Sequence, residues 1–201
     1  MSTETAPPHS QSSPAPASSF GPGALATPAN ALTLARLLLT PVWLAVVVDR
    51  GPSWPAFALG FVLALTDGFD GWLARRQGTT RSGAFLDPLA DKIFVVGGLW
   101  ALVVQGGFWW LPVALITGRE AIISVYRSWM GKRGVSIPAR QWAKVKTVTQ
   151  EVAIGFALLP LTDTAGVGIG LADVVLWAAV ALTLVTGVQY LLDGRKAALA
   201  A

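Results

Sequence analysis

Six apolar stretches dominate the pattern of hydrophobic and polar residues along the chain. They cover residues 32–48, 54–75, 83–104, 108–130, 143–161 and 171–192. Each is close to the roughly 20 residues that an α-helix needs to cross about 30 Å of hydrocarbon. Loop-like breaks rich in glycine separate several of them, at 49–53, 105–107 and 162–170. The pattern therefore predicts an all-α integral membrane protein with six transmembrane helices.

The composition agrees with this prediction, because 53% of the residues are hydrophobic and only 13% are charged. A typical soluble domain carries about 25% charged residues. Residues 1–30 differ: they are rich in Ser, Pro and Ala, contain no Lys or Arg, and have few apolar groups to offset the entropy of ordering. We expect a disordered tail over 1–30, one six-span membrane domain over 31–195 and a short tail over 196–201.

Lysine and arginine residues are concentrated in alternate loops, which predicts the orientation of the helices. They occur in or beside the connections that follow the second and fourth stretches and after the sixth, at Arg75, Arg76, Arg81, Arg127, Lys132, Arg133, Arg140, Lys144, Lys146, Arg195 and Lys196. The opposite loops carry only Arg50. Because cytoplasmic loops are enriched in Lys and Arg, we expect both termini and the two basic loops to lie in the cytosol.

Four aspartates interrupt the second and third apolar stretches. Asp67 and Asp70 are three residues apart, and Asp87 and Asp91 are four apart, so each pair lies on one face of its helix. An aspartate near the centre of a transmembrane helix costs roughly 2.5 to 3.5 kcal/mol. Such residues are tolerated where they face a polar cavity, pair with cations or bind metal, so they mark a candidate functional site.

The two aspartate pairs are expected to meet at one depth. Asp67 lies eight residues before Arg75, and Asp91 eight residues after Gly83, so each is about 12 Å from the short turn between the two helices. Four carboxylates carry more negative charge than the nearby Arg75 and Lys92 can balance. Oxygen ligands favour hard cations, so we expect Mg²⁺ or Mn²⁺, and two ions if a pyrophosphate also binds. The alternative is four acids that only form salt bridges within the bundle.

The residue inventory limits the catalytic groups. The chain has no cysteine, so thiolate metal sites and cysteine nucleophiles are excluded. Its single histidine, His9, lies in the predicted tail. A general base in the folded part must therefore be a carboxylate or, less favourably, a lysine or tyrosine.

The aspartates belong to a longer motif that resembles the signature of the CDP-alcohol phosphatidyltransferases, DxxDGxxAR followed by GxxxDxxxD. The specified positions are filled by Asp67, Asp70, Gly71, Ala74, Arg75, Gly83, Asp87 and Asp91. Seven residues separate Arg75 from Gly83, one fewer than the common spacing. This difference falls in the turn and leaves both aspartate pairs intact.

The resemblance implies a six-span bundle, generally homodimeric, with a cytosol-facing cavity that holds two divalent metal ions. The implied reaction transfers a phosphatidyl group from CDP-diacylglycerol to a small alcohol, with CMP as the leaving group. The metal ligands would be Asp67, Asp70, Asp87 and Asp91, of which Asp91 would also be the general base. The residues around the CDP group would be Gly71, Ala74, Arg75 and Gly83.

A second resemblance concerns the acceptor. Residues 118–150, with an Arg-Glu pair in the fourth stretch, a basic loop and a KxKT start to the fifth, are similar to family members that use glycerol 3-phosphate. Arg119 and Arg127 are eight residues apart and so lie roughly on one helix face. Cations beside a metal site suit an acceptor that bears phosphate. We therefore expect Arg119, Arg127, Lys144 and Lys146 to bind the phosphate of glycerol 3-phosphate, giving phosphatidylglycerophosphate.

Several alternatives stay open at this level. Cardiolipin synthases and inositol-phosphate transferases share the aspartate motif, and the basic residues could serve only topology and contact with anionic lipid. A divalent-metal transporter is a different class, but its repeated halves would place acids twice, whereas these form one block. The expected partners are CDP-diacylglycerol, glycerol 3-phosphate, membrane lipids and a second copy of the chain, with no nucleic acid. The expected location is the cytoplasmic membrane of a bacterium, with the active site facing the cytosol.

Overall fold

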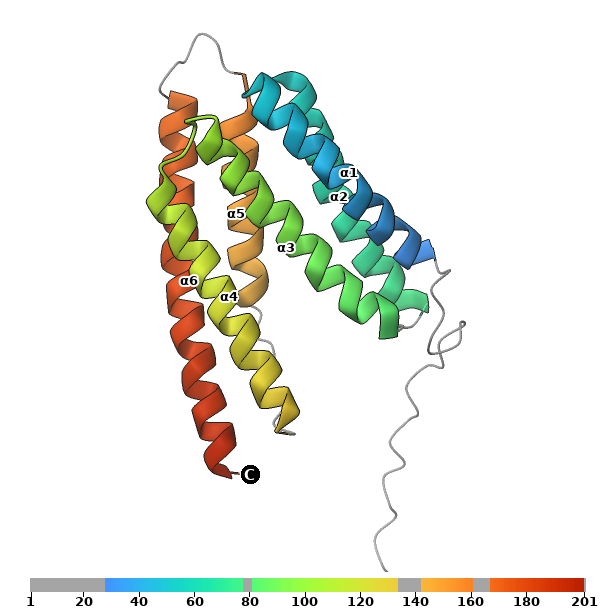
Figure 1. Ribbon diagram of the computed structural model, residues 1–201, viewed down its shortest axis with the longest axis vertical. Coiled ribbons are helices and arrows are strands. Elements are labelled where there is room, and N and C mark those ends of the chain that lie inside the picture. The colour runs from blue at the N-terminus through green and yellow to red at the C-terminus, as the bar shows by residue number, and fades with distance from the viewer. Residues whose placement is uncertain (1–27, 78–80, 134–141, 161–166, 201) are drawn as a thin grey trace, which may run out of the picture.

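The residues that the structure describes form six helices, and each corresponds to one predicted apolar stretch. The computed structural model describes residues 28–77, 81–133, 142–160 and 167–200; within these ranges it leaves out the side chains at 29, 67, 70–77, 81–85, 142–143, 167–169 and 199–200. The helices are α1 Pro28–Arg50, α2 Trp54–Gln77, α3 Arg81–Val104, α4 Trp110–Lys132, α5 Trp142–Leu158 and α6 Val167–Ala200 (Figure 1). The described residues contain no strand, so the all-α, six-helix prediction is confirmed.

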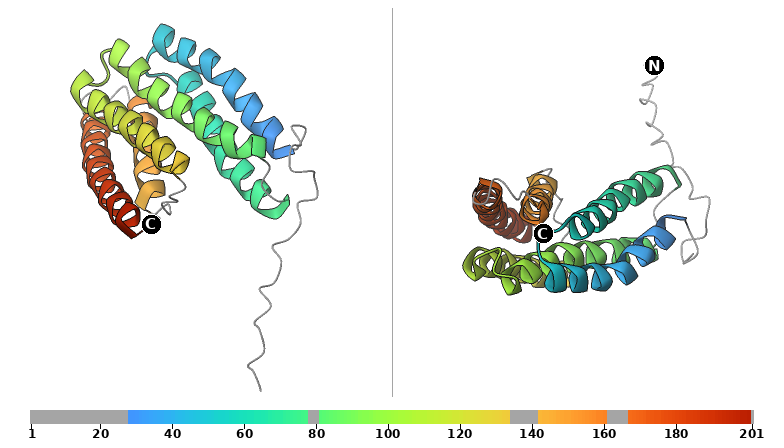
Figure 2. Two further views of the ribbon diagram at one scale, coloured as in Figure 1. Left: turned by 60° about the horizontal axis from the view of Figure 1, so that its bottom comes forward. Right: turned by 90° about the horizontal axis from the view of Figure 1, so that it is seen from above.

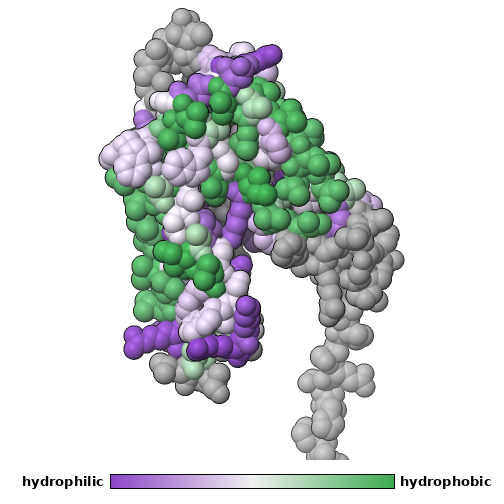
Figure 3. Space-filling view, viewed as in Figure 1, coloured by the Kyte–Doolittle hydropathy of each residue, from purple (hydrophilic) through white to green (hydrophobic). Residues whose placement is uncertain are grey.

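The surface of the helices is apolar around its middle. Leu38 on α1 is 69% exposed and Val125 on α4 is 71% exposed, and many other large hydrophobic side chains face outward. Figure 3 shows hydrophobic residues over the middle of the visible face and hydrophilic residues at its upper and lower ends. By length and composition, segments of α1 (Asn30–Arg50) and α6 (Gly170–Ala198) can each cross a membrane. Such a broad apolar surface is unusual for a soluble monomer and suits hydrocarbon.

The helices alternate in direction and form two layers. Seen from above, α1, α3 and α4 lie along one side and α2, α5 and α6 along the other (Figure 2). Helix α1 packs against both α2 and α3, α6 packs against α4 and α5, and α5 also packs against α2 and α3. In Figure 1, α1 begins on the right at its own lower end, and α6 ends at the bottom of the bundle. Helix α6 continues to Ala200 and so includes most of the segment 196–201, whereas the tail 1–27 lies outside the described residues.

A fully buried tryptophan on α1 fixes the two helices that carry the aspartates. The Trp43 indole packs against Phe94 of α3 at 4.7 Å between ring centroids, and its Nε1 donates a 2.9 Å hydrogen bond to the carbonyl of Ala56 on α2. A Cβ at Gly60 would lie 2.8 Å from the indole, and one at Gly98 would lie 2.5 Å from it. Glycine is therefore needed on both neighbouring helices for this close packing, which sets the positions of α2 and α3 relative to α1.

Candidate active site

The backbone of α2 and α3 is helical at all four aspartate positions. Asp87 and Asp91 therefore lie one turn apart on the same face of α3, as their spacing predicts. The side chains at the other predicted site positions of the motif lie outside the described part of the structure: Asp67, Asp70, Gly71, Ala74, Arg75 and Gly83. Their roles as metal ligands and CDP contacts stay predictions.

Helix α1 orients the half-buried carboxylate of Asp87. The hydroxyl of the buried Thr33 donates a 2.8 Å hydrogen bond to Asp87 Oδ1. Thr33 is 54 residues before Asp87 in the chain, so the packing of α1 on α3 makes this contact. A hydrogen bond of this kind fixes the direction of a carboxylate and is the usual support of a metal ligand.

Charged side chains of four helices act electrostatically on the carboxylate of Asp91. The buried Arg36 on α1, Lys146 on α5 and the adjacent Lys92 attract it electrostatically, and Glu120 on α4 repels it. The amine of Lys92 donates a hydrogen bond to Ser124 Oγ on α4, and this hydroxyl donates to the carbonyl of Glu120 at 2.6 Å. Asp91 therefore lies where α1, α3, α4 and α5 bring their charged side chains together.

The described part of the predicted metal site fits a divalent cation in its donor chemistry. Asp87 and Asp91 supply hard carboxylate oxygens one helical turn apart, and a hydroxyl already orients one of them. Within the described side chains no group of three or more acids or histidines is close enough to hold a metal ion. The two further expected ligands, Asp67 and Asp70, lie outside that search.

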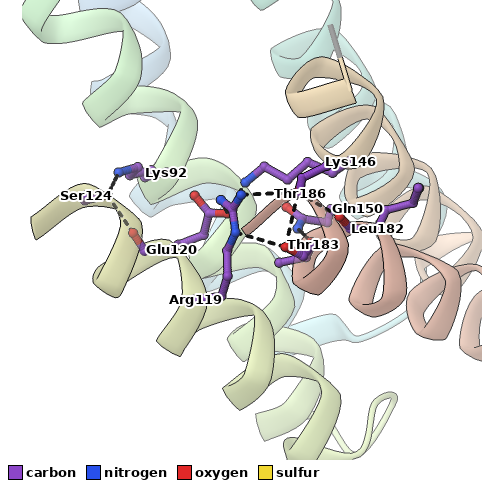
Figure 4. A network of polar contacts seen from close by, with 9 residues as sticks. All are labelled: Lys92, Arg119, Glu120, Ser124, Lys146, Gln150, Leu182, Thr183 and Thr186. Carbon is purple, nitrogen blue, oxygen red and sulfur yellow. Dashed lines mark hydrogen bonds and ion pairs between the residues drawn. The ribbon is translucent and has the colours of Figure 1, made fainter. Parts of the chain in front are cut away.

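Two of the four predicted acceptor cations meet at one glutamate. Lys146 Nζ forms an ion pair with Glu120 Oε1, and Arg119 Nη1 contacts the same oxygen at 2.9 Å (Figure 4). Lys146 is buried and also lies within electrostatic reach of Asp91. The role of Lys146 as a ligand of the acceptor phosphate stays a prediction.

The other two predicted cations lie apart from this cluster. Arg127 donates from Nε to the hydroxyl of Tyr190 on α6 at 3.2 Å, and its guanidinium lies 5.4 Å from the centre of that ring. Lys144 is exposed in the first turn of α5. The described contacts thus associate Arg127 with the aromatic side chains of α4 and α6, not with Glu120.

An apolar cavity lies beside the aspartate positions, between α1, α2, α3 and α5. Its walls include Phe57, Ala64, Phe94 and Gly155, and Glu151 is the single charged residue among the described residues that line it. Ala64 is three residues before Asp67, and Phe94 is three residues after Asp91. The cavity therefore begins about one helical turn from both aspartate pairs.

Sequence reasoning assigned no site role to three charged residues of this region, Arg36, Glu120 and Glu151, although it noted Glu120 as part of the Arg-Glu pair. Each is a charged side chain inside an apolar stretch, so the rule that identified the aspartates could have identified them. No comparable signal marks Thr33, Thr183 or Thr186, because threonine is common in membrane helices and its importance depends on what it contacts.

Six helices with an apolar exterior, together with a cluster of carboxylates and cations inside them, define a membrane-embedded enzyme. The family model of the CDP-alcohol phosphatidyltransferases matches residues 26–185, so the chain belongs to this family. The family predicted from the aspartate motif, and with it the prediction of a phosphatidyltransferase, is confirmed.

Curated bacterial relatives cover most of the chain. A "Probable phosphatidylglycerophosphate synthase" of Mycobacterium tuberculosis (strain ATCC 25618 / H37Rv) is 41% identical over 180 residues, which is 85% of this chain and 82% of the relative. A "CDP-diacylglycerol--glycerol-3-phosphate 3-phosphatidyltransferase" of Escherichia coli (strain K12) is 40% identical over 173 residues, covering 82% of this chain and 92% of the relative. A protein of the same name from Sodalis glossinidius is 43% identical over 171 residues, with the same two coverages.

Proposed function

We propose that this protein transfers the phosphatidyl group of CDP-diacylglycerol to glycerol 3-phosphate, giving phosphatidylglycerophosphate and CMP. The observation that carries the proposal is the buried ammonium of Lys146, which Glu120 holds within electrostatic reach of Asp91. A cation beside the expected general base suits an alcohol that also bears a phosphate. Relatives at about 40% identity are named for the same acceptor, which supports the choice.

Asp91 is the proposed general base. In the reaction, the acceptor hydroxyl oxygen forms a bond to the phosphorus that carries the diacylglycerol, and the bond from that phosphorus to the CMP oxygen breaks. The hydroxyl proton passes to the Asp91 carboxylate, and CMP leaves as its phosphate anion. Arg36, Lys92 and Lys146 keep the Asp91 carboxylate in place by electrostatic attraction. Positioning of the two substrates supplies much of the rate enhancement, because an ordinary aspartate is a weak base.

Two divalent cations, Mg²⁺ or Mn²⁺, are the proposed cofactors. They would be held by Asp67, Asp70, Asp87 and Asp91, and when bound they would supply the positive charge that neutralises the diphosphate of the donor. The hydrogen bond from Thr33 supports this assignment, because it orients the Asp87 carboxylate as residues around a metal ligand do.

The donor lipid is proposed to lie across α2 and α3. Its CDP group would contact Gly71, Ala74, Arg75 and Gly83, where small residues allow a close approach and the arginine meets phosphate. Part of one acyl chain would enter the apolar cavity that begins one turn from the aspartates. Both ends of the donor would then be held on the same pair of helices.

The acceptor phosphate is proposed to bind among the predicted cations, with Lys146 nearest the reacting hydroxyl. Its burial supports this role, because a charge removed from water interacts more strongly with another charge. Lys144 and Arg127 lie at the same end of α5 and α4, where they would attract the acceptor.

The protein is proposed to function as a homodimer in the cytoplasmic membrane of a bacterium, with both termini and the active site on the cytosolic side. The distribution of basic residues supports this orientation, since Lys132 and Arg133 follow α4 and Arg195 and Lys196 lie near the end of α6. The relatives named above are bacterial.

One assay tests the proposed reaction. Purified protein is given CDP-diacylglycerol and Mg²⁺ with glycerol 3-phosphate, phosphatidylglycerol, inositol phosphate or serine in turn, and CMP release is measured. We expect CMP release with glycerol 3-phosphate to exceed that with the other alcohols. A preference for phosphatidylglycerol or inositol phosphate would instead identify a cardiolipin synthase or an inositol-phosphate transferase.

A further inference from the structure

The guanidinium of Arg119 already has protein partners at each of its three nitrogens. Nε donates to the carbonyl of Thr183 at 3.0 Å, Nη2 donates to the hydroxyl of Thr186 at 3.2 Å, and Nη1 contacts Glu120 Oε1 at 2.9 Å. Two of these partners lie on α6 (Figure 4). A guanidinium that binds a substrate phosphate usually presents a two-pronged edge to it, whereas here the Nε–Nη2 edge of Arg119 faces α6 and Nη1 faces Glu120.

Helix α6 provides a specific place for Arg119. A Cβ at the buried Gly187 would lie 2.9 Å from Arg119 Nε and 3.2 Å from its Cγ, so any larger residue there would push the side chain away. The hydroxyl of Thr186 donates to the carbonyl of Leu182 at 2.7 Å, which orients it to accept from Arg119. Helix α6 supplies both features, the small Gly187 and the oriented Thr186, and both favour a single fixed position for the Arg119 side chain.

Glu120 connects Arg119 to the amine of Lys146. Its Oε1 atom contacts both cations, so one carboxylate oxygen lies between them. On α5, one turn after Lys146, the buried Gln150 donates from Nε2 to the hydroxyl of Thr183 at 3.0 Å. The same turn of α6 therefore holds both α4 and α5 in place around Glu120.

We infer that Arg119 and Glu120 are positioning residues for the acceptor site: α6 holds Arg119, Arg119 holds Glu120, and Glu120 holds the Lys146 ammonium where it meets the acceptor phosphate. The inference rests on the proposed function. It also reassigns Arg119, which the sequence pattern had predicted as a direct ligand of the phosphate.

The charges explain why a glutamate is needed between the two cations. A buried ammonium without a counter-ion is costly, so Glu120 allows Lys146 to stay charged inside the bundle. An ammonium has three N–H donors, and the bond to Glu120 uses one of them. Arg119, Glu120 and Lys146 together carry one net positive charge, which the dianionic phosphate of the acceptor complements.

Steady-state kinetics of Arg119→Gln, Glu120→Gln and the double variant test the inference. We expect each single variant to raise the KM for the acceptor by about 10-fold or more, as for loss of one charged hydrogen bond, with the KM for CDP-diacylglycerol unchanged. Since Arg119 acts through Glu120, the double variant should resemble the more impaired single variant. Lower kcat with both KM values unchanged would show a merely structural role, and multiplied losses would show that Arg119 binds the acceptor itself.

Gly187→Ala provides a test that leaves every charge in place. It should reproduce the higher acceptor KM, because the added methyl group displaces Arg119. Gly170→Ala is the matched control, since it lies on the same helix and its Cβ would meet nothing within 4 Å. Equal effects of the two alanines would overturn the inference.

The kinetic experiments distinguish a wrong acceptor from a wrong role of Arg119 and Glu120. The wild type is first assayed with each alcohol, and a wild type that uses another acceptor refutes glycerol 3-phosphate only. The same KM comparison is then made with the alcohol that the protein uses, and its outcome decides the positioning role.

Discussion

At the scale of single residues, the aspartates carry the prediction with the largest expected effect. Asp67→Asn, Asp70→Asn or Asp87→Asn should abolish CMP release, because an amide cannot replace a charged metal ligand. Membrane insertion should be retained, since a neutral side chain is easier to bury. CMP release and the amount of protein in the membrane fraction are the two measurements. Full activity in any of the three variants would refute the metal assignment.

The hydrogen bond from Thr33 to Asp87 should increase the apparent affinity of the enzyme for Mg²⁺. Thr33→Val removes the hydroxyl and keeps the shape, and we expect the Mg²⁺ concentration for half-maximal activity to rise about 10-fold, as for other supporting residues of metal sites. Thr40→Val is the matched control, because this buried hydroxyl on the same helix bonds only to the carbonyl of Arg36 among the contacts that the structure describes. A change of equal size in both variants would contradict the role of Thr33.

Asp91 should act mainly on the chemical step. If it is the general base, Asp91→Asn should lower kcat by about 100-fold or more and change the binding of CDP-diacylglycerol much less. Equilibrium binding of the donor and single-turnover rates of CMP release separate these two effects. Losses of similar size in binding and turnover would make Asp91 chiefly a metal ligand.

The amino-acid sequence was sufficient to predict some residues of the site but not the contacts between them. Asp87 and Asp91 were predictable, because a carboxylate inside an apolar helix is costly and so needs a function. Arg36 carries the same signal of a charge inside an apolar helix, but its proximity to Asp91 and the hydrogen bond from Thr33 to Asp87 were not predictable, because only the packing of α1 on α3 brings those side chains together.

At the scale of the helices, α1 has a role that its composition does not indicate. No site residue was predicted on it, yet it packs against both helices that carry the aspartates and contributes Thr33 and Arg36. The fit of Trp43 between Gly60 and Gly98 allows this close packing. Hydropathy predicted that α1 exists, but not which helices it touches.

The cavity between α1, α2, α3 and α5 should set how well the donor binds. Gly155→Leu would add a side chain towards Phe57, whose ring lies 3.9 Å from a Cβ at this position, and so fill the cavity. We expect a higher KM for CDP-diacylglycerol with long acyl chains and a smaller change for short-chain donor, because only a long chain reaches the cavity. Gly118→Leu, where a Cβ meets nothing within 4 Å, is the control. An equal change for both chain lengths would contradict the assignment.

At the scale of the whole molecule, the orientation in the membrane can be tested by cysteine labelling, since the chain has no native cysteine. Lys132→Cys lies at the basic end of α4 and Asp49→Cys at the opposite end of the bundle, and both positions are exposed. An impermeant maleimide should label Asp49→Cys in intact cells and Lys132→Cys only after the membrane is opened. The reverse pattern would place the active site outside.

The sequence alone determined the number of helices, their approximate limits and the family. Each of these depends on residues that are close together in the chain: a run of about 20 apolar residues can satisfy its backbone only as a helix, and the aspartate motif lies within two adjoining helices. Composition and spacing are therefore sufficient for these properties.

The tertiary structure decided which charged groups meet. Thr33 reaches Asp87 across 54 residues, and Arg119 reaches Thr186 across 67, so neither contact follows from local spacing. The sequence pattern assigned the same role, binding of the acceptor phosphate, to Arg119, Arg127, Lys144 and Lys146. Packing separated them, because α6 and Glu120 satisfy the guanidinium of Arg119 while Lys146 is buried beside Asp91. A charged side chain takes its role from the partners around it, and those partners come from other helices.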